Sequence, residues 1–416
     1  MNHDTLLIHA GQSPDPATGA RALPIHPSNC YMFADTQTAA RVFNQEIPGY
    51  LYTRVNNPTN DAAEQRMAAL EGGTAALVTS SGMAAIFLAV QNLAAAGDHI
   101  VASTSLYGGT DTLFRHTLKR FGIGVDFVAP TAAAVAAAIR PGTKAVYCET
   151  IGNPACDVPD LAAICAAARA AGVPVLVDNT FAPVICRPFE HGADIVVHST
   201  SKWIGGHGAA IGGAIVEGGR FDWDNPRFPE FNGPDESYHG LVYSKIQGAP
   251  FTAKARAQGM RNIGVCASPF NSYAFLLGLE SLAVRMARHC ENTLALAQWL
   301  EAHPAVAWVN YPGLPGHPQH ETAKRILKGG FGGVLGFGLK GGRAAGEAFI
   351  NRVRLASHVA NVGDAKTLVI HPASTTHAQM PPGQLAASGI TPEFVRVSVG
   401  LEDARDIQAD FARALA

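Results

Sequence analysis

The sequence predicts an α/β protein built on a mostly parallel sheet with helices on both faces. Between residues 74 and 216, apolar runs typical of buried strands alternate with helical stretches, which is the pattern of a parallel sheet. Polar residues follow several strands at their carboxyl ends, where open α/β sheets bind ligands. A chain of 416 residues also exceeds one ordinary hydrophobic core, so a smaller C-terminal α/β domain is expected.

Three segments are expected along the chain: an N-terminal arm over 1–57, a large domain over 58–285 and a small domain over 286–416. The arm mixes Pro, Asn, Tyr and Gly with little periodicity, which is typical of a segment outside the core. Asn56-Asn-Pro-Thr-Asn60 then caps a helix that runs through Leu70 and ends at Gly72-Gly73, because Asn favours helix starts and Gly favours helix ends.

The large domain is predicted to contain seven strands, with helices between most of them. The strands are expected at 74–79, 99–103, 124–128, 144–149, 173–178, 194–199 and 210–216, and the helices include 83–96, 110–121, 131–140 and 157–171. Residues 217–262 are rich in Asp, Pro and aromatic side chains, so an ordered excursion without regular periodicity is expected there.

A long helix from Pro269 to about His303 is expected to lead into the small domain, because its apolar residues recur at helical spacing. The small domain is predicted to have strands at 306–309, 333–339, 368–370 and 394–399, and helices at 343–352 and from Asp403 to the end. Strands separated by helices indicate an α/β cap.

Composition narrows the possible partners to small molecules. The formal net charge is −2, and no basic block occurs, which argues against nucleic acid and anionic membrane. The amino terminus lacks the features of a signal peptide, and no apolar run is long enough to span a membrane. The seven cysteines are scattered without Cys-x-x-Cys spacing. Reduced, mostly buried thiols and a cytoplasmic location are expected.

The stretch Asp194–Gly208 is the strongest indication of a functional site. The apolar run Ile195-Val-Val197 has the composition of a buried strand, and Ser199, Ser201 and Lys202 follow its carboxyl end. Partial desolvation lowers the pKa of an amine, so Lys202 could act as a nucleophile toward a carbonyl. The two serines could bind a phosphate. Lys202 alone does not exclude the alternative of a surface lysine after a strand.

Two further segments favour the functional interpretation. Asp178 lies at the carboxyl end of another buried strand, where its carboxylate could keep a pyridinium nitrogen protonated. Ser81-Gly82-Met83 lies between a strand and a helix, so free backbone N–H groups and the positive end of a helix dipole form an anion site there. A Schiff-base lysine, a pyridinium carboxylate and a phosphate site together indicate pyridoxal 5′-phosphate, the cofactor that withdraws electrons from carbanions.

Other motifs suggest a dinucleotide site or a metal site, but the support for these sites is weaker. Gly206-His-Gly208 and Gly329-Gly-Phe-Gly-Gly333 resemble dinucleotide-binding glycines, but neither follows a strand and opens a helix as that motif requires. His317-Pro-Gln-His320 lacks nearby Cys or acidic ligands, so a solvated loop is expected there and no metal site.

The motifs together resemble those of a known family, the Cys/Met-metabolism or transsulfuration enzymes of pyridoxal-phosphate fold type I. The resemblance runs from His9-Ala-Gly to Arg396-Val-Ser-Val-Gly-Leu-Glu402. Its motifs occur in the family's order: Tyr52-Thr-Arg54 with Asn57-Pro-Thr, Ser81-Gly-Met83, Tyr107-Gly-Gly, Glu149-Thr with Asn153-Pro, Asp178-Asn-Thr180 and Ser199-Thr-Ser-Lys202.

The resemblance implies roles for individual residues. Lys202 and Tyr107 would be catalytic, with the Tyr107 ring stacked on the cofactor. Arg396 would bind the substrate carboxylate, with Asn153 and Asn361 also near the substrate. The implied cofactor-binding residues are Tyr52, Arg54, Ser81, Gly82, Met83, Tyr107, Asn153, Asp178, Thr180, Ser199, Ser201 and Lys202. In the family, the pair equivalent to Tyr52 and Arg54 reaches the phosphate of a neighbouring subunit, which implies dimers that share active sites and assemble into a homotetramer.

Within the family, Asn361–Lys366, His371–His377 and the insertion Pro234–Tyr243 are most similar to the sulfhydrylases that use O-acetylhomoserine. The implied activity is replacement of acetate at Cγ by sulfide or a small thiol, which gives homocysteine or its thioether. The alternatives are O-succinylhomoserine sulfhydrylase, cystathionine γ-synthase and methionine γ-lyase. The γ-lyases typically carry Cys two residues after the stacking Tyr, where this chain has Gly109. A catalytically inactive scaffold of the same fold is the alternative from a different class.

Overall fold

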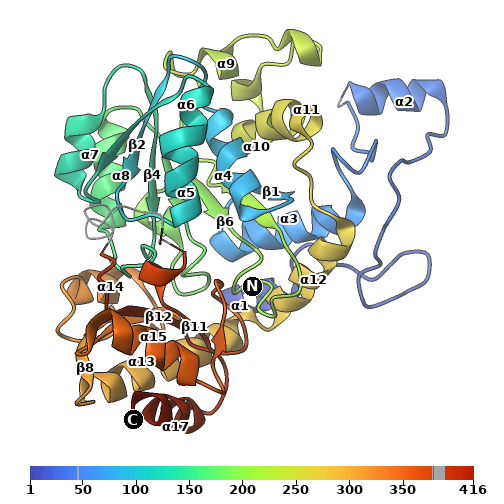
Figure 1. The fold of residues 1–416 in the computed structure, drawn as a ribbon. Helices are drawn as coiled ribbons and strands as arrows, with labels where there is room; N and C mark the ends of the chain where they lie inside the picture. Colours follow the sequence, from blue (N-terminus) through green and yellow to red (C-terminus); the bar gives the residue numbers. More distant parts are fainter. Residues whose placement is uncertain (45, 377, 379–388) are drawn as a thin grey trace.

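The computed structural model describes residues 1–44, 46–376, 378 and 389–416, which form two β-sheets with surrounding helices (Figure 1). His377, which belongs to one of the motifs above, lies outside the described residues. The larger sheet has seven strands in the order β1-β7-β6-β5-β4-β2-β3 and the smaller has five in the order β10-β11-β12-β9-β8. The α/β class and the mostly parallel seven-stranded sheet are therefore confirmed. A division of the chain near residues 57 and 285 stays a prediction.

The larger sheet is parallel except at β7, which is antiparallel to both of its neighbours. Its strands are β1 (Ala75–Thr79), β2 (His99–Ser103), β3 (Gly124–Val128), β4 (Thr143–Glu149), β5 (Val175–Asp178), β6 (Ile195–His198) and β7 (Gly213–Glu217). The last strand was expected to start at 210 but starts at Gly213, because residues 210–212 belong to the loop beside the cavity described below.

Two layers of helices cover this sheet, since apolar side chains point to both of its faces. One face packs on α3 (Pro58–Glu71), α7 (Ala132–Ala138) and α8 (Leu161–Ala170), and the other on α4 (Gly82–Gln91), α10 (Pro250–Lys254) and the segment between β2 and β3. That segment was expected to be one helix over 110–121. It consists of α5 (Gly108–Thr112), a π-helical turn (Leu113–Thr117) and α6 (Leu118–Arg120).

The five-stranded sheet lies below the larger one in Figure 1. It contains β8 (Val306–Asn310), β9 (Val334–Leu339), β10 (Ser357–His358), β11 (Leu368–Ile370) and β12 (Phe394–Ser398), with α14 (His320–Ile326), α15 (Gly342–Arg352) and α17 (Ala404–Leu415). The sequence did not reveal β10 or α14. The helix expected over 269–303 is divided at Ser281 into α12 (Pro269–Glu280) and α13 (Leu282–Glu301).

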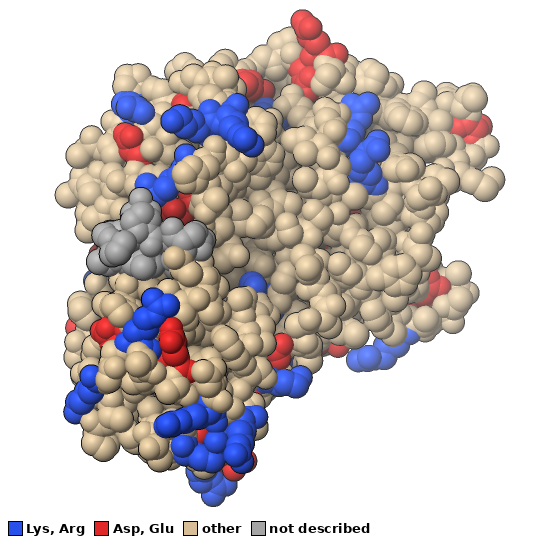
Figure 2. All heavy atoms as spheres, in the orientation of Figure 1, with Lys and Arg blue, Asp and Glu red and all other residues tan. Residues whose placement is uncertain are grey.

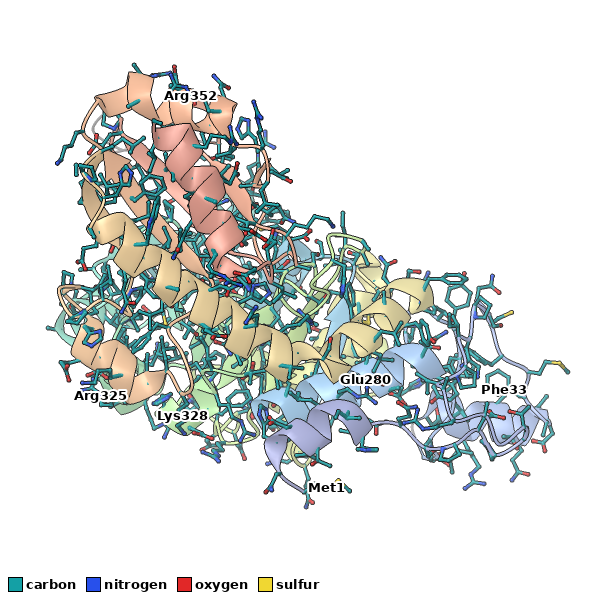
Figure 3. The ribbon with its side chains drawn as sticks, turned by 90° about the horizontal axis from the view of Figure 1, so that it is seen from below. Met1, Phe33, Glu280, Arg325, Lys328 and Arg352 are labelled. Carbon is teal, nitrogen blue, oxygen red and sulfur yellow. The ribbon has the colours of Figure 1, made fainter. Side chains whose placement is uncertain are left out.

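The first 57 residues contain two helices that the sequence did not reveal, α1 (His3–His9) and α2 (Thr36–Phe43). The α1 helix packs on the body of the protein, where Leu7 is buried and the Leu70 carbonyl lies 2.8 Å from the His3 ring. The chain then extends away, so that α2 projects from the body in Figure 1 and Phe33 lies at the far end of this extension in Figure 3. Part of the predicted arm therefore belongs to the core.

Residues 217–262 form the expected ordered excursion, with α9 (Pro229–Asn232), α10 and α11 (Arg261–Ile263). Trp223 stacks on Phe231 at 4.4 Å between ring centroids, and Phe228 and Phe251 pack around the same indole. These rings are buried and belong to the hydrophobic cluster that also contains one face of the larger sheet, so they anchor the excursion on the body of the protein.

Charged side chains of both signs are interspersed over the face seen in Figure 2, without one continuous basic surface. Among the described residues, no helix combines the length and the apolar character that crossing a membrane requires.

Candidate functional site

A cavity of about 420 Å³ opens at the carboxyl ends of the larger sheet, opposite β12 of the smaller sheet. This volume lies in the usual range for small-molecule sites. Most of the residues predicted for the site line it: Ser81, Gly82, Met83, Tyr107, Asn153, Asp178, Thr180, Ser199, Ser201, Lys202, Asn361 and Arg396. The topology brings them together because β4, β5 and β6 are parallel neighbours whose ends meet at one edge.

Lys202 lies in the turn that follows β6, with its side chain partly buried in the cavity wall. Its Nζ donates a hydrogen bond of 2.5 Å to Asn361 Oδ1. Burial, and then the positive charge of Arg396, lower the pKa of the amine. A larger share of Lys202 is therefore neutral near pH 8 than in an exposed lysine, which is the form that attacks a carbonyl.

Asp178 ends β5 and presents a partly buried carboxylate to the same cavity. Its Oδ1 accepts a hydrogen bond of 2.9 Å from the Thr180 backbone N–H, and its Oδ2 accepts one of 3.2 Å from the Tyr147 hydroxyl. Burial raises the pKa of Asp178, whereas these donors and the nearby His198 lower it. Such a fixed carboxylate can face a pyridinium nitrogen, whose positive charge would favour its ionised form.

The start of α4 forms an anion site beside Lys202. Ser81 caps this helix by accepting from the Ala84 N–H at 3.0 Å, which leaves the N–H groups of the first helical residues directed at the cavity. A Cβ atom at Gly82 would lie 2.6 Å from Ser199 Cβ, so only glycine allows the helix start and the Ser199 loop to approach this closely. Helix N–H groups and serine hydroxyls in one concave surface suit a phosphate.

Tyr107 is half exposed at the edge of the cavity, where its ring is free to cover a planar ligand. Sterics explain why position 109 is glycine, because a Cβ atom there would lie 2.5 Å from Tyr107 Cε1. A larger residue at 109 would therefore displace the ring.

Arg396 reaches the cavity from β12 and is almost completely buried. It donates to Asn153 Oδ1 at 3.0 Å and to the Asn361 carbonyl at 3.3 Å. Burial lowers the pKa of the guanidinium to about 10, so it stays charged at neutral pH. A buried, fixed guanidinium that lines a cavity is suited to bind a carboxylate through two parallel hydrogen bonds.

Tyr52 and Arg54 are the predicted site residues that this cavity does not include. Both side chains are exposed, with the Arg54 guanidinium 5.1 Å from the centre of the Tyr52 ring. Within one subunit, these two residues and the cavity are therefore separate.

Sequence reasoning missed some of the cavity wall. Glu149 was left out of the predicted site, yet it lines the cavity and accepts hydrogen bonds from the backbone N–H groups of Tyr107 at 2.6 Å and Asn153 at 3.2 Å. Tyr147 does not line the cavity, but its hydroxyl supports the wall from behind by donating to Asp178. The remaining apolar wall is formed by Ile86, Ile151, Phe181, Ala210, Ile211, Ala360 and Val362.

The alternative sites have no support in the structure. Neither of the glycine motifs opens a helix, so neither forms a dinucleotide site. The expected solvated loop at His317 was wrong, because the His317 side chain is buried and His320 begins α14. Burial lowers the pKa of His317 to about 4. Among the described residues, no three His, Cys, Asp or Glu side chains form a metal-ligand group.

Comparisons with known proteins extend over the whole chain. A family model described as Cys/Met metabolism PLP-dependent enzyme matches residues 4–416. A homocysteine synthase from Schizosaccharomyces pombe is 51% identical and the match covers 99% of this chain and 97% of that protein. An O-acetyl-L-homoserine sulfhydrylase 1 from Thermus thermophilus is 50% identical, with 100% of both chains covered.

The solved structures agree with these relatives. A crystal structure of a putative O-acetylhomoserine (thiol)-lyase from Campylobacter jejuni, which contains N′-pyridoxyl-lysine-5′-monophosphate, is 36% identical, covers 100% of both chains and has a TM-score of 0.97.

Proposed function

The chain belongs to the Cys/Met metabolism PLP-dependent enzyme family, and on this premise we propose that it replaces the acetate of O-acetyl-L-homoserine by sulfide or a small thiol. The products with sulfide are L-homocysteine and acetate, which makes the reaction a step of methionine biosynthesis. The observation that carries this proposal is the single cavity in which Lys202, Asp178 and Arg396 meet.

The residues of the cavity fit pyridoxal phosphate. The start of α4 with Ser199 and Ser201 would hold the phosphate, Asp178 would face the ring nitrogen, and Tyr107 would cover the ring. When bound, pyridoxal phosphate supplies an aldehyde for the amino group of the substrate and an electron sink for charge released at its carbon atoms. An inactive scaffold would have no need to keep a partly buried amine, a partly buried carboxylate and a buried guanidinium around one cavity, because burying charge is costly.

The chain's own residues supply positioning and proton transfer. Arg396 would bind the α-carboxylate of the substrate and so fix the direction of the Cα–H bond. Such orientation lowers the entropic part of the activation barrier. Lys202 Nζ, with its lowered pKa, would take the proton from Cα and later move protons at Cβ. Asn361 binds both residues, because its side chain accepts from Lys202 and its carbonyl accepts from Arg396.

The lining of the cavity favours an acetyl over a succinyl leaving group. Among the described residues that line it, Lys202 and Arg396 are the only cations, and the mechanism assigns both. The additional carboxylate of a succinyl ester would therefore lack a cationic partner among these residues, and an unpaired charge in an enclosed site is unfavourable. The γ-lyases typically carry Cys where this chain has Gly109, and the Tyr107 ring lies too close to Gly109 to leave room for that side chain. This geometry argues against the γ-lyase alternative.

A kinetic comparison of the two esters tests the proposed function. With sulfide as the second substrate, kcat/KM for O-acetylhomoserine should exceed that for O-succinylhomoserine at least about tenfold, since one unpaired charge is expected to cost ~1.4 kcal/mol or more. Equal values, or a preference for the succinyl ester, would contradict the proposed donor. Homocysteine and acetate should form in equal amounts, whereas 2-oxobutanoate as the main product would indicate a γ-lyase.

We also propose that Tyr52 and Arg54 complete the phosphate site of a neighbouring subunit, within a homotetramer built from two such dimers. The support is their position outside the cavity of their own subunit. Subunits with Arg54→Ala and subunits with Lys202→Ala should each be inactive alone. After subunit exchange, a hybrid dimer contains one cavity with both native residues, so activity should return to at most about half of wild type per hybrid dimer. Mass spectrometry verifies that the subunits have exchanged. If activity does not recover in these verified hybrids, Arg54 lies outside the site.

A cytoplasmic location is part of the proposal. All seven cysteines lie among the described residues as free thiols, and five of them are buried. Unpaired thiols are typical of a reducing compartment.

A further inference from the structure

Glu149 is a buried carboxylate that the mechanism above does not use. It ends β4 with 6% of its surface exposed, and Asp178 is its register partner on β5. Burial, and then the charge of Asp178, raise its pKa well above the usual value. A carboxylate at such a position is unfavourable by itself, so its contacts must account for its presence.

The two oxygens of Glu149 bind two different segments of the site. Oε1 accepts from the Tyr107 N–H at 2.6 Å, at the loop between β2 and α5, and Oε2 accepts from the Asn153 N–H at 3.2 Å, in the loop after β4. Both loops lack regular backbone pairing at these residues, so the carboxylate replaces it. One side chain thereby sets the distance between the loop that carries the Tyr107 ring and the loop that carries the Asn153 side chain.

The contacts of Asn153 extend this connection to the substrate site. Its side-chain oxygen accepts from Arg396 at 3.0 Å, and Arg396 also donates to the carbonyl of Asn361, whose side chain binds Lys202. A continuous series of hydrogen bonds therefore runs from Tyr107 through Glu149, Asn153, Arg396 and Asn361 to Lys202. Within this series, Glu149 is the member that joins the ring-covering residue to the residues assigned to the substrate.

We propose that Glu149 is a positioning residue for the γ-replacement: it fixes Tyr107 over the cofactor ring and Asn153 against Arg396 in one arrangement. This inference rests on the proposed function for its kinetic consequence. Its structural part, the positions of Tyr107 and of Asn153 against Arg396, does not depend on which substrate is used.

Glu217 provides a matched control. It is also a buried carboxylate at a strand end, and its two oxygens also accept from two backbone N–H groups, those of Phe251 at 3.0 Å and Thr252 at 2.8 Å. Burial raises its pKa to about 7. It lies outside the cavity, so its replacement by Gln should reproduce the structural consequences of losing such a carboxylate without the positioning.

The experiment compares Glu149→Gln, Glu149→Asp and Glu217→Gln as enzymes loaded with pyridoxal phosphate. The amide nitrogen of Gln cannot accept a hydrogen bond, and Asp is one methylene too short to span both N–H groups. We expect both Glu149 variants to change the visible circular dichroism of the bound cofactor. We also expect kcat/KM for O-acetylhomoserine to fall at least about tenfold, mainly because KM rises; a tenfold loss corresponds to ~1.4 kcal/mol. Glu217→Gln should lower only the melting temperature, with the dichroism and kcat/KM within twofold of wild type.

Three results would overturn the proposal. Unchanged dichroism and KM in Glu149→Gln would show a structural role alone, and a wild-type-like Glu149→Asp would show that charge matters and the two contacts do not. Equal changes in Glu217→Gln would show a general loss of stability. The dichroism of the resting enzyme requires no substrate. If wild type fails to use O-acetylhomoserine, the proposed function falls, and the dichroism still decides the role of Glu149.

Discussion

A Lys202→Ala variant is expected to fold, to bind pyridoxal phosphate weakly and to turn over O-acetylhomoserine at least about a thousandfold more slowly than wild type. The variant loses both the covalent attachment point and the group that moves protons at Cα and Cβ, and a positioned acid or base alone contributes about a hundredfold to ten-thousandfold. The visible absorbance of the resting enzyme should be absent. Absorbance spectra, cofactor titration and turnover check these expectations.

Lys254 supplies a control for this variant. It is another buried lysine, its Nζ donates to the Asn92 carbonyl at 2.8 Å, and burial lowers its pKa to about 8. It lies outside the cavity, so Lys254→Met should reduce stability but keep the visible absorbance and turnover. Activity of Lys202→Ala within tenfold of the control would remove Lys202 from the mechanism.

Arg396→Ala should keep the bound cofactor and its absorbance but lose on the order of 2 kcal/mol or more of transition-state stabilisation, about thirtyfold in kcat/KM. The reason is the loss of the guanidinium that would bind the substrate carboxylate. Arg396→Lys should lose activity as well, because an ammonium group cannot form the same two parallel hydrogen bonds and reach Asn153 in the same geometry.

Steady-state kinetics with O-acetylhomoserine and the absorbance of the resting enzyme separate the two effects for Arg396. If Arg396→Ala keeps kcat/KM within about threefold of wild type, a difference under ~1 kcal/mol, the carboxylate is bound elsewhere. Loss of the cofactor from the same variant would instead show that Arg396 supports the cofactor site.

The sequence predicted the sheet because its signals are local. Apolar runs such as Ile195-Val-Val197 are buried on both faces wherever they occur in a parallel sheet, and the residues after them necessarily reach its carboxyl edge. Arg396 was expected at the site only through the resemblance, and in the structure it lines the cavity.

Most of the errors have non-local causes. The apolar spacing that predicted one helix over 269–303 continues across Ser281, but the helix is interrupted there. Apolar spacing alone does not reveal such an interruption. The short helix α1 depends on packing against α3. Helix α2 is an exception, because its cap at Asp35 and its amphipathic pattern are local signals. Glu149 was recognised as the end of a strand, but its partners Tyr107 and Asn153 lie 42 and 4 residues away. Such contacts depend on loop geometry, which local pattern does not specify.

The central claim is that Lys202 carries the cofactor in the cavity between the two sheets. Borohydride reduction of the purified enzyme, followed by proteolysis and mass spectrometry, tests this most directly, because reduction makes the attachment of pyridoxal phosphate to an amine permanent. The predicted result is one modified peptide, with the pyridoxyl phosphate mass on Lys202. Modification of another lysine instead, or none in an enzyme that retains its visible absorbance, would contradict the account.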